Sequence, residues 1–309
     1  MKKEKKKKKE KKKTECSCEM FSGRILYIST PKYKEVPQEL WEARETENLT
    51  ISSLKMVQIP SEIQNLTNLA KLSISENSLE SVPRELHSLS KLISFDCSTN
   101  NVEAVATSTF PESLESLSFQ GCKLSTFTCD APLPNLTSLS LVEDRLPALA
   151  PAGISTFASL RSLNLSYNKD LEELPPSFSE LRALESIKIV GCNLKVFPAC
   201  LYELTNLKSV QLGANSIERF EESPNGTTVE NMRALTTLDV SDNSLVELPP
   251  QLFEMSLTVV LLQANRINRL PRFGRICDTL NALDVSENYI QELPESFYDL
   301  RNIKTVNIR

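Results

Sequence analysis

Side chains that carry most enzyme chemistry are scarce in this chain of 309 residues. The one histidine, His87, follows Leu86 in a segment where a solvent-facing residue is expected, and a nucleophilic site would need that ring beside a serine or cysteine. The seven glycines are scattered and form no phosphate-binding loop. With 40 acidic residues, chance proximity of carboxylates identifies no acid–base pair. The sequence therefore predicts no catalytic residue, no cofactor and no small-molecule substrate.

The eight cysteines follow the spacing of a repeat rather than that of a disulfide framework. Cys122 and Cys192 occupy a position that other copies fill with asparagine, and Cys97 takes an inward position normally held by leucine. We therefore expect small buried thiols in a reducing compartment. Cys16 and Cys18 have the spacing of a lipidation or metal pair, but without a second pair they make a weak zinc site, and no metal site is predicted.

One pattern dominates the chain: Leu-x-x-Leu-x-Leu-x-x-Asn-x-Leu-x-x-Leu-Pro recurs about every 23 residues. A fixed period of this length indicates a solenoid, in which stacked units bury one continuous core. The Leu-x-Leu alternation predicts a short strand, and the proline suits the first turn of a short helix. Units begin at Gly23, Thr46, Leu69, Leu92, Leu114, Leu136, Leu160, Leu184, Leu207, Leu235, Leu257, Leu280 and Ile303.

The predicted fold is an α/β solenoid of about 13 units over residues 23–309. Its strands should form a parallel sheet on the concave face, with short helical or irregular segments on the convex face. Unit nine contains an insertion with Pro224, Asn225 and Gly226, which predicts an exposed loop on the return side. The last unit has no polar cap, so we expect its strand to meet a partner, a second copy or further residues of a longer chain.

The asparagine that follows each strand should hold the turn together. A buried amide can both donate to and accept from backbone groups where the chain leaves the sheet. We expect such a ladder of side chains at Asn77, Asn100, Asn168, Asn215, Asn243, Asn265 and Asn288.

The outward strand positions should line the binding surface, and most of them are serines with few anchoring groups. Units ten to twelve differ, because Asp239, Leu261 and Asp284 share one outward position on successive strands. This acidic patch around an apolar centre could hold a basic segment of a protein partner, or it could be a solvated face. The candidate partner-binding residues are Asp239, Asp242, Leu261, Arg266, Asp284, Glu287 and Tyr289.

Charge is distributed very unevenly along the chain. Residues 1–13 hold ten lysines and two glutamates, a balance of +8, whereas the remainder holds 25 basic and 38 acidic residues, a balance of −13. We expect residues 1–22 to be a disordered basic tail. The tail could serve nuclear import or bind nucleic acid or an anionic membrane through residues 1–13, or it could simply aid solubility. Because no apolar signal segment opens the chain, we expect an intracellular, cytoplasmic protein, with the nucleus as an alternative.

The repeat pattern quoted above resembles the leucine-rich-repeat family. Its 23-residue period with Leu-Pro-x-x-Phe/Leu-x-x-Leu is most similar to the intracellular Ras-associated type, which includes the scribble and erbin scaffolds. The resemblance implies a non-catalytic scaffold or adaptor in signalling or complex assembly that binds proteins through its concave face. A tail-tethered nucleic-acid or membrane protein, and a regulatory subunit of a phosphatase or ubiquitin ligase, are the alternatives.

Overall fold

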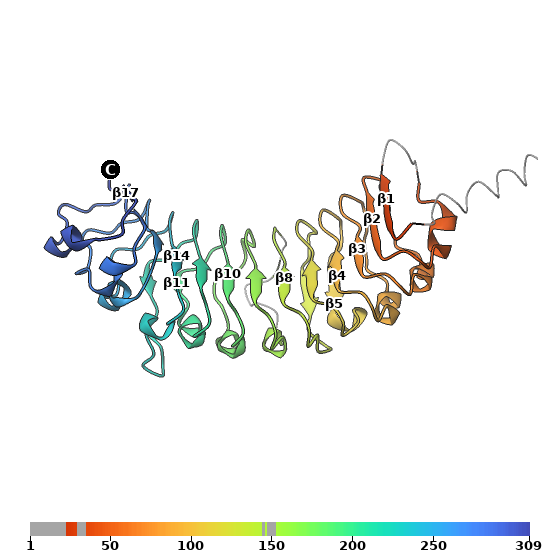
Figure 1. Cartoon of the computed structure of the whole chain (residues 1–309), viewed down its shortest axis with the longest axis horizontal. Helices are drawn as coiled ribbons and strands as arrows, with labels where there is room; N and C mark the ends of the chain where they lie inside the picture. Colours follow the sequence, from red (N-terminus) through yellow and green to blue (C-terminus); the bar gives the residue numbers. More distant parts are fainter. Residues whose placement is uncertain (1–22, 30–34, 144–145, 147–152) are drawn as a thin grey trace, which may run out of the picture.

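The computed structural model describes residues 23–29, 35–143, 146 and 153–309, which form an elongated arc of stacked units (Figure 1). One parallel sheet of 13 strands runs along the arc in chain order, which confirms the predicted solenoid. Its strands are β1 (Ile25–Ser29), β2 (Asn48–Ser52), β3 (Lys71–Ser73), β4 (Ser94–Asp96), β6 (Ser116–Ser118), β8 (Ser138–Ser140), β9 (Ser162–Asn164), β10 (Ser186–Lys188), β12 (Ser209–Gln211), β14 (Thr237–Asp239), β15 (Val259–Leu261), β16 (Ala282–Asp284) and β17 (Thr305–Asn307).

Each unit buries its leucines between its neighbours. In the third unit Leu69, Leu72, Ile74 and Leu79 are fully buried, whereas Lys71 on the same strand is exposed. Strand pairing aligns equivalent positions, so that Leu72 lies beside Phe95 on the next strand. One continuous apolar core therefore runs the length of the sheet, because every unit repeats the same inward positions.

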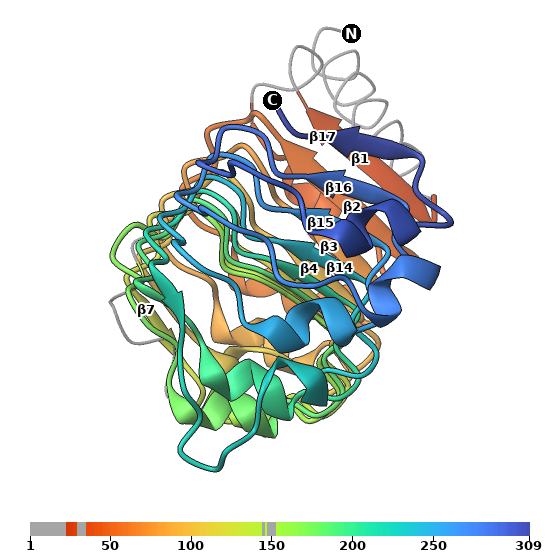
Figure 2. The same ribbon diagram turned by 90° about the vertical axis from the view of Figure 1, so that its left-hand side faces the viewer.

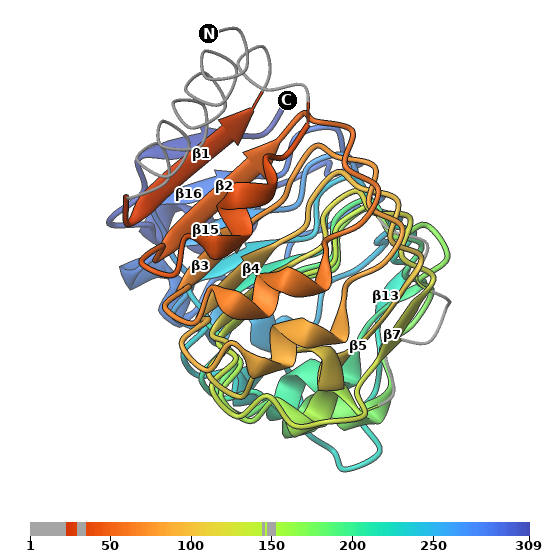
Figure 3. The same ribbon diagram turned by 90° about the vertical axis from the view of Figure 1, so that its right-hand side faces the viewer.

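The return segments form short 3-10 helices rather than α-helices. In η3 the Ile63 N–H donates to the Pro60 carbonyl and the Leu66 N–H to the Ile63 carbonyl, both at 3.1 Å, which is the tighter three-residue repeat. Figures 2 and 3 show these turns on the opposite side of the solenoid from the strands. They are η2 (Gln38–Glu42), η3 (Ser61–Asn65), η4 (Arg84–Ser88), η5 (Thr107–Thr109), η6 (Ile154–Thr156), η7 (Pro176–Glu180), η8 (Ala199–Glu203), η9 (Val229–Asn231), η10 (Pro250–Glu254), η11 (Arg275–Asp278) and η12 (Glu295–Asp299).

Two further small parallel sheets each join neighbouring units. β5 (Ala104–Ala106) pairs with β7 (Thr126–Thr128), and β11 (Val196–Phe197) pairs with β13 (Arg219–Phe220). The predicted loop of unit nine follows β13 and contains Gly226 at a φ of 70°. Within the described part of the chain, no helix combines the length and apolar character needed to cross a membrane. The predicted basic tail, Cys16 and Cys18 lie outside the described residues.

Candidate functional site

The sheet brings three of the candidate partner-binding residues together as the repeat register predicts. Asp239 on β14 pairs with Leu261 on β15, which pairs in turn with Asp284 on β16. Adjacent strands are about 4.8 Å apart, so the two carboxylates are carried on backbones about 10 Å apart with Leu261 between them. All three side chains are half-buried.

Both aspartates also close the turn that follows their strand. Asp239 Oδ1 accepts a hydrogen bond from the Ser241 N–H at 3.0 Å and one from its hydroxyl at 2.6 Å. Asp284 makes the same pair of contacts with Ser286, also at 3.0 and 2.6 Å. One oxygen of each carboxylate is therefore engaged within its own unit, and the other oxygen of Asp284 accepts from Asn307 Nδ2 of the next unit at 3.2 Å. The sequence analysis did not anticipate this second role.

The same turn occurs elsewhere in the sheet. Asp96 accepts from Ser98, and Asn164 accepts from Ser166. Ser166 is only 5% exposed, and its hydroxyl donates to Asn164 Oδ1 and accepts from the Val190 N–H. The signal was present in the sequence as Asp/Asn-x-Ser at one fixed position of several units.

The four remaining candidate residues lie in the turns that follow β14, β15 and β16. Asp242 and Glu287 are exposed and have left-handed backbones, with φ of 52° and 54°. Arg266 is exposed, and Tyr289 is 68% exposed. We call these seven residues the concave acidic patch: Asp239, Asp242, Leu261, Arg266, Asp284, Glu287 and Tyr289. The patch carries four carboxylates, one guanidinium group and two side chains with apolar surface.

Small polar groups line much of the rest of the sheet face. Register places one serine of each of six successive strands in a single row: Ser94, Ser116, Ser138, Ser162, Ser186 and Ser209. Such a row offers few anchoring groups of the aromatic or arginine kind. In the row of Asp239 itself, the two preceding strands carry Gln211 and Lys188, so the concave acidic patch differs in charge from the neighbouring surface.

The asparagine ladder connects each unit to the one before it. Asn243 Oδ1 accepts from the Ile217 N–H at 2.9 Å, and its Nδ2 donates to the Leu212 carbonyl at 3.0 Å, both in the preceding unit. The same amide also donates to Val240 of its own unit. Equivalent contacts are made by Asn77, Asn100, Asn168, Asn215, Asn265 and Asn288. Each amide thus pairs backbone groups that would otherwise be buried without a partner.

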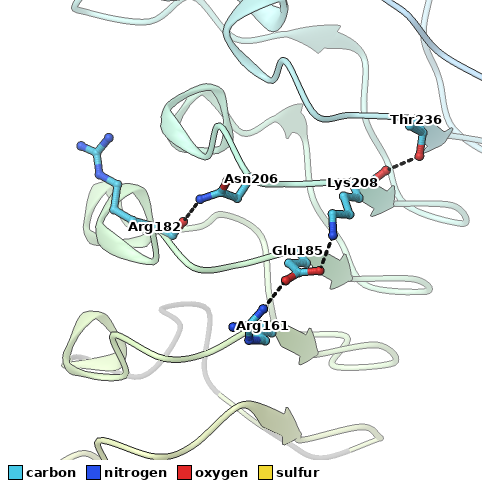
Figure 4. A network of polar contacts seen from close by, with 6 residues as sticks. All are labelled: Arg161, Arg182, Glu185, Asn206, Lys208 and Thr236. Atoms are coloured by element: carbon cyan, nitrogen blue, oxygen red, sulfur yellow. Dashed lines mark hydrogen bonds and ion pairs between the residues drawn. The ribbon is translucent and has the colours of Figure 1, made fainter.

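A second row of asparagines stands where the chain returns to the sheet, and the sequence analysis missed it. Asn206 Nδ2 donates to the Arg182 carbonyl of the preceding unit at 2.9 Å (Figure 4). Asn68, Asn135 and Asn302 make the corresponding contact at the same unit position, directly before the first buried residue of the unit. The repeated Asn-Leu or Asn-Ile pair could have revealed this row.

Ion pairs join the units along the same flank. Glu185 accepts from Arg161 at 2.5 Å and from Lys208 at 2.7 Å, so one carboxylate links three successive units (Figure 4). Hydrogen bonds from Lys208 and Arg161 lower the pKa of Glu185 below its usual range. One carboxylate between two cations thus makes a lateral clamp between units.

No arrangement of catalytic or metal-binding groups is found among the described residues. His87 is exposed on η4, and its Nδ1 contacts the Phe110 carbonyl at 3.1 Å. Burial raises the pKa of Cys192 to about 11 and, together with Glu221, that of Cys200 to about 12, so both thiols stay protonated near neutral pH. Within the same part of the chain, no group of three or more potential ligands could hold a metal ion.

Comparison with known proteins identifies the repeat. A family model described as leucine rich repeat matches residues 134–194, and a second one matches residues 234–255. A leucine-rich-repeat protein of Leptospira interrogans has a TM-score of 0.68 at 20% identity, with 95% of this chain and 86% of that chain covered. The chain is a leucine-rich-repeat protein. Its fold is that of a protein-interaction domain.

Two curated relatives share parts of this repeat array. A leucine-rich repeat serine/threonine-protein kinase of Mus musculus is 35% identical over 133 residues, which are 41% of this chain and 6% of the kinase. Podocan-like protein 1 of Mus musculus is 29% identical over 180 residues, 51% of this chain and 32% of that protein. The chain thus spans well under two thirds of either relative, and the match to the kinase gives no indication of catalysis.

Proposed function

We propose that this protein is a non-catalytic scaffold or adaptor that holds a basic segment of a partner protein on the concave acidic patch. The observation that carries the proposal is the register of Asp239, Leu261 and Asp284, which places two carboxylates on either side of an apolar side chain. Carboxylates in this arrangement favour Lys or Arg on the partner and speed its association, and Leu261 offers an apolar contact between them. The exposed ring of Tyr289 adds an aromatic anchor at the rim.

We further propose that the protein works inside the cell, in signalling or complex assembly. The 23-residue period with Leu-Pro, similar to that of the intracellular Ras-associated repeats, supports this assignment, and so do four cysteines that the structure shows as free thiols, Cys129, Cys192, Cys200 and Cys277. The same sequence features are compatible with a regulatory subunit of a phosphatase or ubiquitin ligase, which would use the same surface.

The test reverses the charge of the two patch carboxylates that, unlike Asp239 and Asp284, do not close a turn. Asp242→Lys with Glu287→Lys leaves the Asp239–Ser241 and Asp284–Ser286 contacts in place. Lysine already adopts a left-handed backbone at two positions of this chain. We expect a labelled peptide of alternating lysine and leucine to bind the wild type and to lose about tenfold or more in affinity with this variant. An unchanged affinity of this variant for the peptide would contradict the proposal.

A matched control separates the patch from the overall charge. Glu230→Lys with Glu292→Lys makes the same change in net charge at exposed sites outside the patch, and it should leave binding nearly unchanged. Pull-downs from cell extract with these baits, and with a bait lacking residues 1–13, then assign each partner to a surface. Partners that are lost only with the tail, and replaced by nucleic acid or lipid, would favour the tail-tethered alternative.

A further inference from the structure

The insertion of unit nine carries the one Asn-Gly pair of this chain, Asn225-Gly226. Figures 1 and 2 show this loop, between β13 and η9, projecting from the stacked units. Both residues are exposed, and a Cβ placed on Gly226 would meet no other atom within 4 Å. The side chain of Asn225 makes no hydrogen bond with the described residues, so its amide can rotate toward the backbone of Gly226.

A tight turn holds the Asn-Gly pair, and all of its contacts lie within the loop. The Gly226 N–H donates to the Ser223 carbonyl at 3.0 Å, and the Asn225 N–H donates to the Ser223 hydroxyl at 3.3 Å. Gly226 has a φ of 70°. Exposed loops without core contacts open locally at little cost in free energy, and such opening releases the Gly226 N–H from its acceptor.

Asn215, in the same unit, is in the opposite situation. It also precedes a small residue, Ser216, but its Nδ2 donates to backbone carbonyls of its own unit and of the preceding one, at 2.6, 2.9 and 3.2 Å. Its Oδ1 accepts from the Leu194 N–H at 3.1 Å. Because these contacts fix the amide, Asn215 Cγ can approach the Ser216 nitrogen only when the ladder between the two units opens. One unit therefore holds an accessible asparagine and a protected one.

We infer that Asn225 is a deamidation site, at which the backbone of Gly226 converts the side-chain amide to a carboxylate without an enzyme. The Gly226 nitrogen attacks Asn225 Cγ, a bond between them forms, the Cγ–Nδ2 bond breaks, and the amide leaves as ammonia with the proton of the Gly226 N–H. Glycine favours this attack because no Cβ crowds the approaching nitrogen.

Water then opens the cyclic imide at one of its carbonyl groups. Opening at Cγ gives an aspartate with a normal peptide bond. Opening at the main-chain carbonyl gives an isoaspartate, whose peptide link runs through the side chain and whose α-carboxylate is free. Either product adds a negative charge close to Glu221 and Glu222. This site goes beyond the proposed function, because neither Asn225 nor Gly226 belongs to the concave acidic patch.

The test is peptide mapping by mass spectrometry on the full chain, incubated at mildly alkaline pH and sampled over weeks. Trypsin releases residues 209–219 and 220–233 as separate peptides, so one digest follows both Asn215 and Asn225. Each conversion raises the peptide mass by about 1 Da, since an amide NH2 group becomes a hydroxyl group. We expect Asn225, located by fragmentation, to convert at least about tenfold faster than Asn215. Methyl transfer from S-adenosylmethionine by an isoaspartyl methyltransferase should label the 220–233 peptide.

Two variants make the outcome specific. Gly226→Ala places a Cβ beside the attacking nitrogen and should slow the conversion of Asn225 by about tenfold or more. Asn225→Gln keeps an amide but would require a larger ring, so the mass gain at this position should disappear, and it leaves the left-handed backbone of Gly226 untouched. Circular dichroism shows whether each variant is folded. Equal rates at Asn225 and Asn215, an unchanged rate in Gly226→Ala, or a persisting mass gain in Asn225→Gln would overturn the inference.

Discussion

The side chain of a single asparagine joins two units of this solenoid, and its partners are backbone groups. Asn243 accepts from the Ile217 N–H and donates to the Leu212 carbonyl of the unit before it. A leucine at this position has similar bulk but can neither donate nor accept, so both backbone groups would remain buried without a partner. The asparagine is therefore required by the turn geometry rather than by solubility.

At the scale of the residue, Asn243→Leu should lower the free energy of unfolding by about 1–3 kcal/mol. The measurement is a urea titration followed by circular dichroism, with the slope of the transition checked for two-state behaviour. Asn268→Leu is the matched control, because Asn268 is exposed and makes no hydrogen bond with the described residues. Equal midpoints for Asn243→Leu and the wild type would show that the ladder does not stabilise the fold.

The buried thiol of Cys200 leads us to expect that the folded protein loses stability at alkaline pH. Burial, with Glu221, raises the pKa of its thiol from 9.0 to about 12. The folded protein thus favours the neutral thiol. The contribution of this thiol to the free energy of unfolding is complete below about pH 9 and is lost as the pH rises from there toward 12. Between pH 8 and pH 10.5 the urea midpoint of the wild type should fall further than that of Cys200→Ala. Parallel changes in the two proteins would contradict this assignment.

At the scale of the element, the turns that follow the strands from β2 to β16 in the main sheet each contain a left-handed residue. Tyr167, Asp242 and Glu287 adopt it with φ between 52° and 63°, and Gly191 adopts it with a φ of 67° in a unit whose asparagine is replaced by cysteine. A Cβ on Gly191 would come within 2.6 Å of the Tyr167 ring of the preceding unit. Glycine adopts this backbone conformation without strain, and its lack of a Cβ permits the close approach of the neighbouring unit.

Gly191→Ala should therefore destabilise the fold by roughly 1–2 kcal/mol from the left-handed backbone alone, with the contact to Tyr167 in addition. In a Tyr167→Ala background the same substitution should be less harmful, because the ring is gone while the backbone strain remains. A double-mutant cycle by urea unfolding measures the difference. If Gly191→Ala lowered the free energy of unfolding equally in both backgrounds, the contact between the two units would not contribute to stability.

Strands and prolines were predictable because the same requirement recurs in every unit. The inward positions of Leu72 and Leu238 must be apolar for the units to stack, so the period reveals the sheet and its register. The 3-10 geometry of the return segments and the pairing of β11 with β13 were not predictable, since both depend on the spacing between neighbouring units. A period in the sequence carries no information on that spacing.

At the scale of the whole molecule, register placed the candidate residues together, but it did not show what they contact. Asp239 and Asp284 lie beside Leu261 as predicted, yet each also closes a turn through a serine two residues later. The groove lined by residues 219–222, 247–250 and 269–272 escaped prediction for another reason. Arg219, Glu247 and Arg269 are separated by more than 20 residues along the chain, and alternating charges in a sequence are typical of a solvated surface.

A solenoid also predicts that stability depends on position along the array, because each unit contacts only its neighbours. Leu163 is fully buried on β9 with a strand on either side, whereas Val306 on β17 is 38% exposed. Leu163→Ala should cost about 2–5 kcal/mol, since it leaves a cavity between two units. Val306→Ala should cost under about 1 kcal/mol, since much of that side chain already contacts water. Urea unfolding of both variants tests this, and a loss for Val306→Ala as large as that for Leu163→Ala would mean that β17 is as firmly held as the centre of the sheet.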